Sequence, residues 1–303
     1  LGSDSDDVLE QAGTAGVVDE VFKSSRIGQA CKKADIVFLC TPIHTIVDYL
    51  PRIGSECSED TIITDAGSTK QWIVEKANSI GTLNRRFIGG HPMTGGETGG
   101  FDNADALLFE NAYWILTPTN HQDSAMVKEL AVLLEKIGAK VMLMSPGLHD
   151  RIAAAVSHLP QLLAVALANQ VGERELRESG LYRKMSAGGF RDMTRIAASS
   201  YDMWHDIVST NKSEIAAALS AYIERLRRIR DDVTGTDLAR VFHTARSFRT
   251  SIPAHSKGFL NPNADLFFSA ADEKGILAEA VSLISENDIN IKDIELIRRN
   301  TSC

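Results

Sequence analysis

The fold of this chain is decided by one apolar run, Ala34-Asp35-Ile36-Val37-Phe38-Leu39-Cys40, which ends at Thr41-Pro42. A run without polar alternation is typical of a strand that is buried on both faces, as in a parallel sheet covered by helices. Four more predicted strands are shorter, at residues 61–65, 86–89, 112–116 and 140–144. Helical patterns lie between them, at residues 43–54 (interrupted by Pro51), 71–79 and 123–137. This alternation predicts a doubly wound, Rossmann-type α/β domain.

The N-terminal residues read as the end of a further strand, Leu1-Gly2-Ser3-Asp4, followed by a short helix at residues 6–12. A dinucleotide-binding domain normally opens with a strand, a G-x-G-x-x-G turn and a helix, and an acidic residue about 20 residues later binds the ribose. The sequence contains no G-x-G-x-x-G. We therefore expect that the first strand and Gly-rich turn, roughly 30 residues, would precede Leu1, and that Asp4 is the ribose-binding acid. The alternative is that Asp4 is an ordinary helix N-cap.

The pattern changes after residue 146. From His149 to about Ile252 the apolar residues follow helical spacing, which predicts a second, all-helical domain suited to dimerisation or to a bundle core. A linker then leads to a predicted strand at 264–268, a helix at 275–284 and a strand at 289–297. The expected domains are a dinucleotide-binding domain at 1–146, N-terminally incomplete, a helical substrate and dimerisation domain at 147–252, and a partial regulatory segment at 253–303.

Composition excludes several classes of protein. A net charge of -8 argues against a nucleic-acid-binding face, which would be basic. The four cysteines lack metal or disulfide spacing, and Cys40 is expected to be a buried thiol. The longest apolar region, at 152–168, is interrupted by polar residues, so we expect a buried helix and no membrane span. We expect a cytoplasmic protein without a signal peptide or bound metal.

The loop with the clearest chemical content runs from Phe87 to Gly100. It holds six glycines, His91 and Glu97, just past the end of a predicted strand. Ligands bind at that edge of open α/β sheets, and so many glycines indicate unusual backbone angles or a ligand against the main chain. Histidine titrates near neutrality, which suits a general base. The alternative is a surface loop with an incidental histidine.

Five motifs carry a resemblance to a known family. In order they are Cys40-Thr41-Pro42-Ile43, Asp65-Ala66-Gly67-Ser68-Thr69-Lys70, Gly89-Gly90-His91-Pro92-Met93, Val156-Ser157-His158-Leu159-Pro160 and Gly188-Gly189-Phe190-Arg191-Asp192-Met193-Thr194-Arg195-Ile196-Ala197. Together they resemble the prephenate/arogenate dehydrogenase family of tyrosine biosynthesis, over residues 1 to about 252. The last segment resembles the start of an ACT regulatory domain, through residues 272–277 and 287–291.

The resemblance implies a reaction, the NAD-dependent oxidative decarboxylation of prephenate to 4-hydroxyphenylpyruvate. A hydride leaves the ring for the nicotinamide, a proton leaves the C4 hydroxyl for a base, and the ring carboxylate departs as carbon dioxide. The resemblance gives His91 the role of hydrogen-bond acceptor and Ser68 that of orienting His91 and the hydroxyl. Ser68 could also cap the following helix.

The same resemblance implies the binding residues. Arg195 would bind the ring carboxylate through its guanidinium, with Arg191 as the weaker alternative. The other substrate-binding positions are Thr94, Glu97, Gln161 and Trp204, and Trp204 could equally be core. The cofactor-binding positions are Asp4, Thr41, Pro42, Ile43, Asp65 and Gly67. Asp4 favours NAD, because a carboxylate would repel the 2′-phosphate of NADP.

One departure from the family keeps the substrate open. Many members carry a second histidine where this chain has Gln161, a position that faces the substrate side chain, so arogenate is an alternative to prephenate. A β-hydroxyacid-type dehydrogenase would place a catalytic lysine on the helical domain, but Lys184 and Lys212 lie in polar stretches. A more distant alternative is an amino-acid-binding regulatory protein with a decayed dehydrogenase fold. The resemblance also implies a homodimer and a possible tyrosine effector.

Overall fold

Five strands form one sheet in the order β1-β2-β3-β4-β5. The computed structural model describes residues 1–95, 100–177, 180–235, 237–252 and 273–287, with Leu266, Phe268 and Ile289, and divides into the units Leu1–Leu260 and Asn261–Cys303. The strands are β1 (Ile36–Leu39), β2 (Ile62–Asp65), β3 (Phe87–Pro92), β4 (Tyr113–Thr117) and β5 (Lys140–Leu143). β1, β2 and the start of β3 run parallel, β4 is antiparallel to β3, and β5 is parallel to β4. All five predicted strands are present, and the sheet is mixed.

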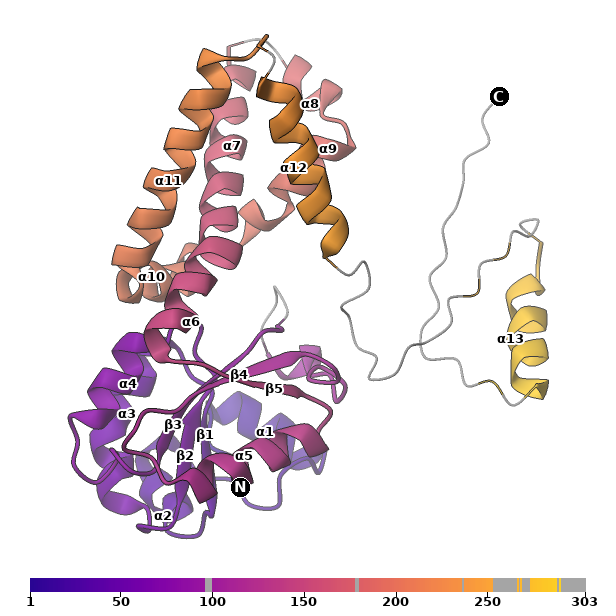
Figure 1. Cartoon of the computed structure of the whole chain (residues 1–303). Helices are drawn as coiled ribbons and strands as arrows, with labels where there is room; N and C mark the ends of the chain where they lie inside the picture. Colours follow the sequence, from indigo (N-terminus) through magenta and orange to yellow (C-terminus); the bar gives the residue numbers. More distant parts are fainter. Residues whose placement is uncertain are drawn as a thin grey trace. The chain divides into compact units, whose positions relative to one another are not determined.

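Successive side chains of the central strands enter two different cores, one on each face of the sheet. Ile63 and Phe87 belong to a cluster with α3 (Ile43–Glu56) and α4 (Gln71–Asn78). Their neighbours Ile62 and Ile88 belong to a second cluster with α5 (Ser124–Lys136). Each fully buried aliphatic side chain contributes about 1.5–3 kcal/mol. Helices therefore cover both faces, and the prediction of a Rossmann-like doubly wound domain is confirmed (Figure 1).

Three local predictions in this domain are wrong. Pro51 lies inside α3 and does not interrupt it, because the burial of Leu50 and Ile53 holds the helix across the missing N–H. Cys40 is an exposed thiol, since β1 ends at Leu39 and the chain leaves the sheet there. The predicted N-terminal strand is a single parallel bridge between Gly2 and Val21. The smaller elements are α1 (Asp6–Thr14), η1 (Ser24–Arg26), α2 (Ile27–Cys31) and η2 (Phe101–Asn103).

After β5 the described chain is helical as far as Ile252, as predicted. The elements are α6 (Pro146–Ala153), η3 (Ala154–His158), α7 (Leu159–Glu175), α8 (Leu181–Met185), α9 (Gly188–Thr194), η4 (Arg195–Ala198), α10 (Tyr201–Thr210), α11 (Lys212–Asp231) and α12 (Asp237–Ser251). Figure 1 shows α6, η3 and α7 as one rod that leads from the sheet into these helices. η3 is a π-helical turn that ends two residues before Pro160. It widens the helix where the proline ring cannot continue the hydrogen-bond ladder.

The rod Pro146–Glu175 is, in the described part of the chain, the helical run long and apolar enough to cross a membrane by length and composition. Only 28% of its most apolar stretch is buried. The expectation of a buried helix therefore holds for some residues, such as His158 and Ala164, whereas Val156 is exposed. In the unit Asn261–Cys303, the predicted helix is present as α13 (Ile276–Glu286). The two strands predicted there fall almost entirely outside the described residues.

Candidate active site

Three predicted site segments meet at one edge of the sheet. Thr41 and Pro42 follow β1 and are exposed, and Ser68 follows β2 and is partly exposed. His91 lies inside β3, opposite Ile115 of β4, so the prediction that it follows the strand is wrong. β1, β2 and β3 are neighbours in the sheet, which places their carboxyl ends side by side where α/β proteins bind ligands.

A chain of hydrogen bonds runs from His91 into the helical domain. Nδ1 of His91 lies 2.7 Å from Nε2 of His149, and Nδ1 of His149 lies 2.8 Å from Oδ1 of Asp150. The Asp150 carboxylate also accepts the backbone N–H groups of Lys70 at 2.7 Å and Gln71 at 2.9 Å. His149 and Asp150 are buried in α6, whereas His91 is partly exposed. The imidazole of His91 is thus anchored through Nδ1 in a residue that is only partly exposed.

The surroundings of His91 keep its imidazole neutral. Burial lowers the pKa of His91 well below its usual value, and the proximity of His149, Lys70 and His158 acts in the same direction. Burial also lowers the pKa of His158 to about 4, against the opposing effect of the Asp150 carboxylate. A neutral His91 has a lone pair available near neutral pH, which is what a hydrogen-bond acceptor requires.

Asp65 supports this edge from inside the sheet. Its carboxylate is fully buried, forms an ion pair with the buried Lys70, and accepts the N–H of Gly67 at 2.9 Å and of Gly90 at 3.0 Å. Burial lowers the pKa of Lys70, while the neighbouring carboxylates oppose that shift. The Asp65 oxygens therefore have partners within the protein. This geometry favours a supporting role for Asp65 over the direct cofactor contact predicted for it.

Tight packing explains several of the motif glycines. A Cβ at Gly89 would lie 2.4 Å from Oγ1 of Thr117, and one at Gly90 would lie 2.5 Å from the backbone oxygen of Asp65. Both glycines therefore serve the packing of β3, and the expected ligand approach does not account for them. Thr94 is partly exposed beyond β3. Glu97, predicted at the pocket edge, lies outside the described residues.

Residues on the helical domain carry the predicted substrate contacts. Arg195 begins η4 and is exposed. Gln161 is buried, and its Nε2 donates to the backbone oxygen of Ile196 at 2.9 Å, so its amide holds the segment that carries Arg195. Trp204 is partly buried and meets His158 edge-on, with ring centroids 6.0 Å apart. Asn211 donates to Nδ1 of His158 at 3.3 Å.

The helix-cap alternatives for Ser68 and Asp4 are wrong. α4 begins at Gln71 with Lys70 at the N-cap position, and Asp150 supplies the cap from the helical domain. Asp4 is exposed and precedes Ser5, which occupies the N-cap position of α1. The sequence reasoning missed His149 and Asp150. Their neighbour Arg151 is also polar, so no local pattern marked these two residues.

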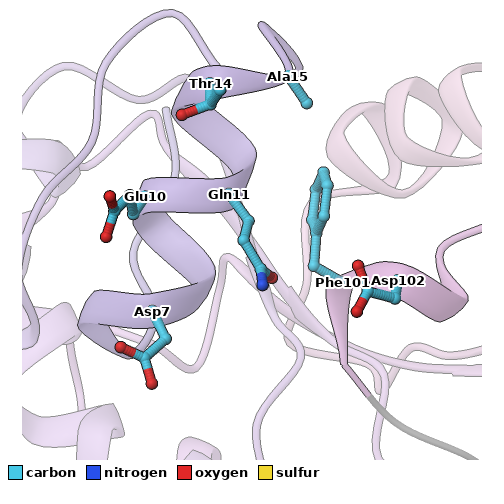
Figure 2. Close-up of a pocket in the computed structure, with 7 residues that line it drawn as sticks. All are labelled: Asp7, Glu10, Gln11, Thr14, Ala15, Phe101 and Asp102. Carbon is cyan, nitrogen blue, oxygen red and sulfur yellow. The ribbon is translucent and has the colours of Figure 1, made fainter.

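A separate hollow of about 640 Å³ opens between α1 and η2 (Figure 2). Its lining residues are Asp7, Glu10, Gln11, Thr14, Ala15, Phe101 and Asp102. None of the predicted site residues lies in it, and its three carboxylates would repel an anionic substrate. The site therefore remains at the edge that holds His91.

Comparison with known proteins identifies the family. The model described as "Prephenate dehydrogenase, nucleotide-binding domain" matches residues 1–143, and "Prephenate dehydrogenase, dimerization domain" matches residues 145–246. The prephenate dehydrogenase of Bacillus subtilis (strain 168) is 35% identical over 297 residues, 97% of this chain and 79% of that protein. This chain belongs to the prephenate dehydrogenase family.

Solved structures of prephenate dehydrogenase relatives share the fold. The prephenate dehydrogenase from A. aeolicus, in complex with hydroxyphenyl propionate and NAD+, matches with a TM-score of 0.77 and 31% identity, covering 83% of this chain and 88% of that chain. Synechocystis arogenate dehydrogenase matches with a TM-score of 0.71 and 30% identity, covering 82% and 88%. The resemblance to the prephenate dehydrogenase family is thereby confirmed.

Proposed function

We propose that this protein catalyses the NAD-dependent oxidative decarboxylation of prephenate to 4-hydroxyphenylpyruvate, an oxidoreductase step of tyrosine biosynthesis. The observation that carries the proposal is His91, a neutral imidazole at the carboxyl edge of the sheet, anchored through Nδ1 to a buried His149–Asp150 pair. A neutral acceptor at that place suits the removal of a hydroxyl proton. Membership of the prephenate dehydrogenase family supports the substrate.

In this reaction His91 accepts the proton of the C4 hydroxyl through its free ring nitrogen. NAD, when bound, would supply the acceptor for the hydride of the same carbon. The ring carboxylate leaves as carbon dioxide, and aromatisation makes the reaction strongly favourable, so the protein mainly has to align the hydroxyl with its acceptor. Ser68 lies in the loop beside the buried Asp65–Lys70 pair, and its hydroxyl orients the substrate and His91.

The residues proposed to hold NAD fit a nucleotide. Thr41 and Pro42 are exposed where β1 ends, and Ile43 begins α3. A Cβ at Gly67 would lie 3.0 Å from both Asp65 and Ile73, so this turn stays narrow. The exposed carboxylate of Asp4 favours NAD. NADP used as efficiently as NAD would refute that preference.

Arg195 binds the ring carboxylate. Gln161 holds the segment that carries Arg195 through its hydrogen bond to Ile196. The other residues around the substrate are Thr94, Glu97 and Trp204. A guanidinium suits a carboxylate because it donates two parallel hydrogen bonds. Arg195→Ala should raise KM for prephenate at least about tenfold, the loss of roughly 1.5–3 kcal/mol for a charged hydrogen bond. An unchanged KM would remove the binding role.

Arogenate is the second candidate substrate, because Gln161 is a neutral amide at the position where many family members carry histidine. The similarity to Synechocystis arogenate dehydrogenase keeps this candidate open. Turnover of both substrates should be measured with purified full-length protein, and with His91→Asn. The proposal expects prephenate oxidation that falls about 10²–10⁴-fold in His91→Asn. Exclusive use of arogenate would change the substrate, and near-normal activity of His91→Asn would remove its catalytic role.

We propose domain boundaries at residues 1–146, 147–252 and 253–303, and a homodimer in the cytoplasm. Exposed apolar side chains on α11 and α12, such as Leu226 and Phe242, fit a surface covered by a second copy, within a stretch described as a dimerization domain. Equilibrium sedimentation should give twice the chain mass of 33.0 kDa. A monomer at micromolar concentration would refute the dimer.

Residues 253–303 are proposed as the start of an ACT-like domain that responds to tyrosine. The supporting observation is α13, which begins after Gly275 in the left-handed conformation and matches the helix predicted at 275–284. Tyrosine should inhibit the full-length protein and not a variant that ends at Ile252. Equal inhibition of both proteins would assign tyrosine to another site.

A further inference from the structure

The hydrogen bonds of His91 and His149 determine which ring nitrogens carry protons when both imidazoles are neutral. The Asp150 carboxylate can only accept, so Nδ1 of His149 must donate to it over 2.8 Å. When the His149 imidazole is neutral, its single proton lies on Nδ1 and its Nε2 is an acceptor. Nδ1 of His91, 2.7 Å away, must then be the donor in that contact. Nε2 of His91 consequently carries the lone pair.

Asp150, at the end of this series of hydrogen bonds, is held by residues of both domains. α4 has no capping side chain of its own, and the two oxygens of Asp150 accept its first N–H groups, from Lys70 and Gln71. Asn211 holds the backbone oxygen of Asp150 at 2.8 Å. Asp150 is buried, so water does not compete for its oxygens. The carboxylate therefore cannot turn away from His149 without giving up the cap of α4.

We propose that His149 and Asp150 are positioning residues that act through His91: they hold His91 as the Nδ1–H tautomer, so that Nε2 is the atom that accepts the substrate proton. The consequence for the reaction rests on the proposed function. When Nε2 takes the proton, the Nδ1–H of His91 donates to His149, whose other nitrogen faces the Asp150 carboxylate. The positive charge that develops on His91 is thereby stabilised without passing a proton along the chain.

The direct test is the tautomer of His91 in the substrate-free protein. Nitrogen-15 spectra of histidine-labelled full-length protein distinguish Nδ1–H from Nε2–H, and the signal that disappears in His91→Asn belongs to His91. We expect Nδ1–H. An Nε2–H tautomer of His91 in the wild-type protein would overturn the proposal. Because no substrate is present, this result is independent of prephenate turnover, and wild-type protein that fails to oxidise prephenate would refute the proposed function instead.

Variants of His149 test the effect on turnover and leave the caps of α4 in place. His149→Leu removes the acceptor for His91, and kcat should fall about 10²-fold or more while KM changes less than about threefold. His149→Gln restores an oxygen acceptor for His91. Its kcat should be at least about tenfold higher than that of His149→Leu, which corresponds to roughly 1.4 kcal/mol. The positioning role would be contradicted if His149→Leu had the kcat of the wild-type protein, or if His149→Leu and His149→Gln had the same kcat.

A matched pair separates positioning from helix capping. Asp206 of α10 accepts the N–H of His44 at 3.2 Å, near the start of α3. Like Asp150, it is a carboxylate of the helical domain that caps a helix whose own N-cap residue makes no side-chain hydrogen bond. Asp150→Ala and Asp206→Ala each remove such a cap. Only Asp150→Ala should change the tautomer signal of His91. An unchanged tautomer signal in a folded Asp150→Ala protein would overturn the role of Asp150. If that variant does not fold, the kcat values of His149→Leu and His149→Gln test the positioning role instead.

Discussion

The sheet domain and the helical domain bury different kinds of side chain. The sheet domain has two largely aliphatic clusters, one on each face, with residues such as Leu50, Ile63, Leu130 and Leu134 fully buried. Half of the buried residues described in the helical domain are polar: His149, Asp150, His158, Gln161 and Asn211. Its buried apolar residues are Ala153, Ala154, Ala164, Ile207 and Ile215. The sheet domain is therefore packed mainly through aliphatic side chains, whereas the helical domain buries an equal number of hydrogen-bonding groups.

The largest expected effect concerns the ion pair that the described part of the sheet domain buries completely, Asp65–Lys70. Lys70→Met leaves the Asp65 carboxylate buried without its ion-pair partner, which should lower the free energy of unfolding by about 3–5 kcal/mol. Urea denaturation measures this. The double variant Lys70→Met/Asp65→Asn should recover part of the loss, because no unpaired charge remains. A loss below about 1 kcal/mol in Lys70→Met would show that the pair does not hold this edge together.

The contrast between the two cores is tested by a pair of leucines. Leu130 is fully buried in α5, whereas Leu226 of α11 is 47% exposed. Leu130→Ala should cost about 2–5 kcal/mol at any protein concentration. Leu226→Ala should cost at most about 0.5 kcal/mol in the dilute monomer and more at concentrations where a dimer forms. Equal losses in dilute solution would remove the distinction between the domains.

Acid should lower the free energy of unfolding through the buried imidazole of His158. Below pH about 6.5 the unfolded chain protonates His158, but the folded protein does so only near a pKa of about 4. The free energy of unfolding should therefore fall by about 1.4 kcal/mol per pH unit in this window, roughly 3 kcal/mol in total. The lowered pKa of His91 adds to the loss. His158→Gln should flatten the dependence and exposed His121→Gln should not; identical profiles would exclude His158 as the source.

The smallest expected effect is at the cap of α3. Asp206→Ala removes the carboxylate that accepts the N–H of His44, which should cost about 1 kcal/mol. Thermal unfolding of the variant measures the shift. Asp202→Ala, one turn earlier in the same helix and exposed, should cost no more than about 0.5 kcal/mol. Equal shifts would mean that Asp206 does not connect the domains.

The strands and most helices could be predicted from the sequence because apolar periodicity depends on neighbouring residues. The run at 34–40 became β1, and the helix at 123–137 became α5 with Asp123 as its cap. The place of His91 within β3 could not be predicted, because its pairing with Ile115 depends on a strand more than twenty residues away. The continuation of α3 through Pro51 could not be predicted, because tertiary burial outweighs the local penalty of proline.

The candidate site could be predicted only where a motif carried it. His91, Ser68 and Arg195 came from motifs, but His149 and Asp150 lie 58 and 59 residues beyond His91, and a contact between domains leaves no local pattern. Two residues predicted to contact a ligand instead make hydrogen bonds or ion pairs within the protein. Gln161 holds the backbone of Ile196, and Asp65 holds Lys70, so both act within the protein before any ligand arrives.

The central claim is that polar residues buried in the helical domain act on the reaction through His91. A double-mutant cycle of His91→Asn and His149→Leu, with kcat for prephenate as the readout, tests it most directly. If His149 acts through His91, His149→Leu lowers kcat about 10²-fold in the wild-type background and less than about threefold in His91→Asn. A full, multiplicative loss in both backgrounds would contradict the account.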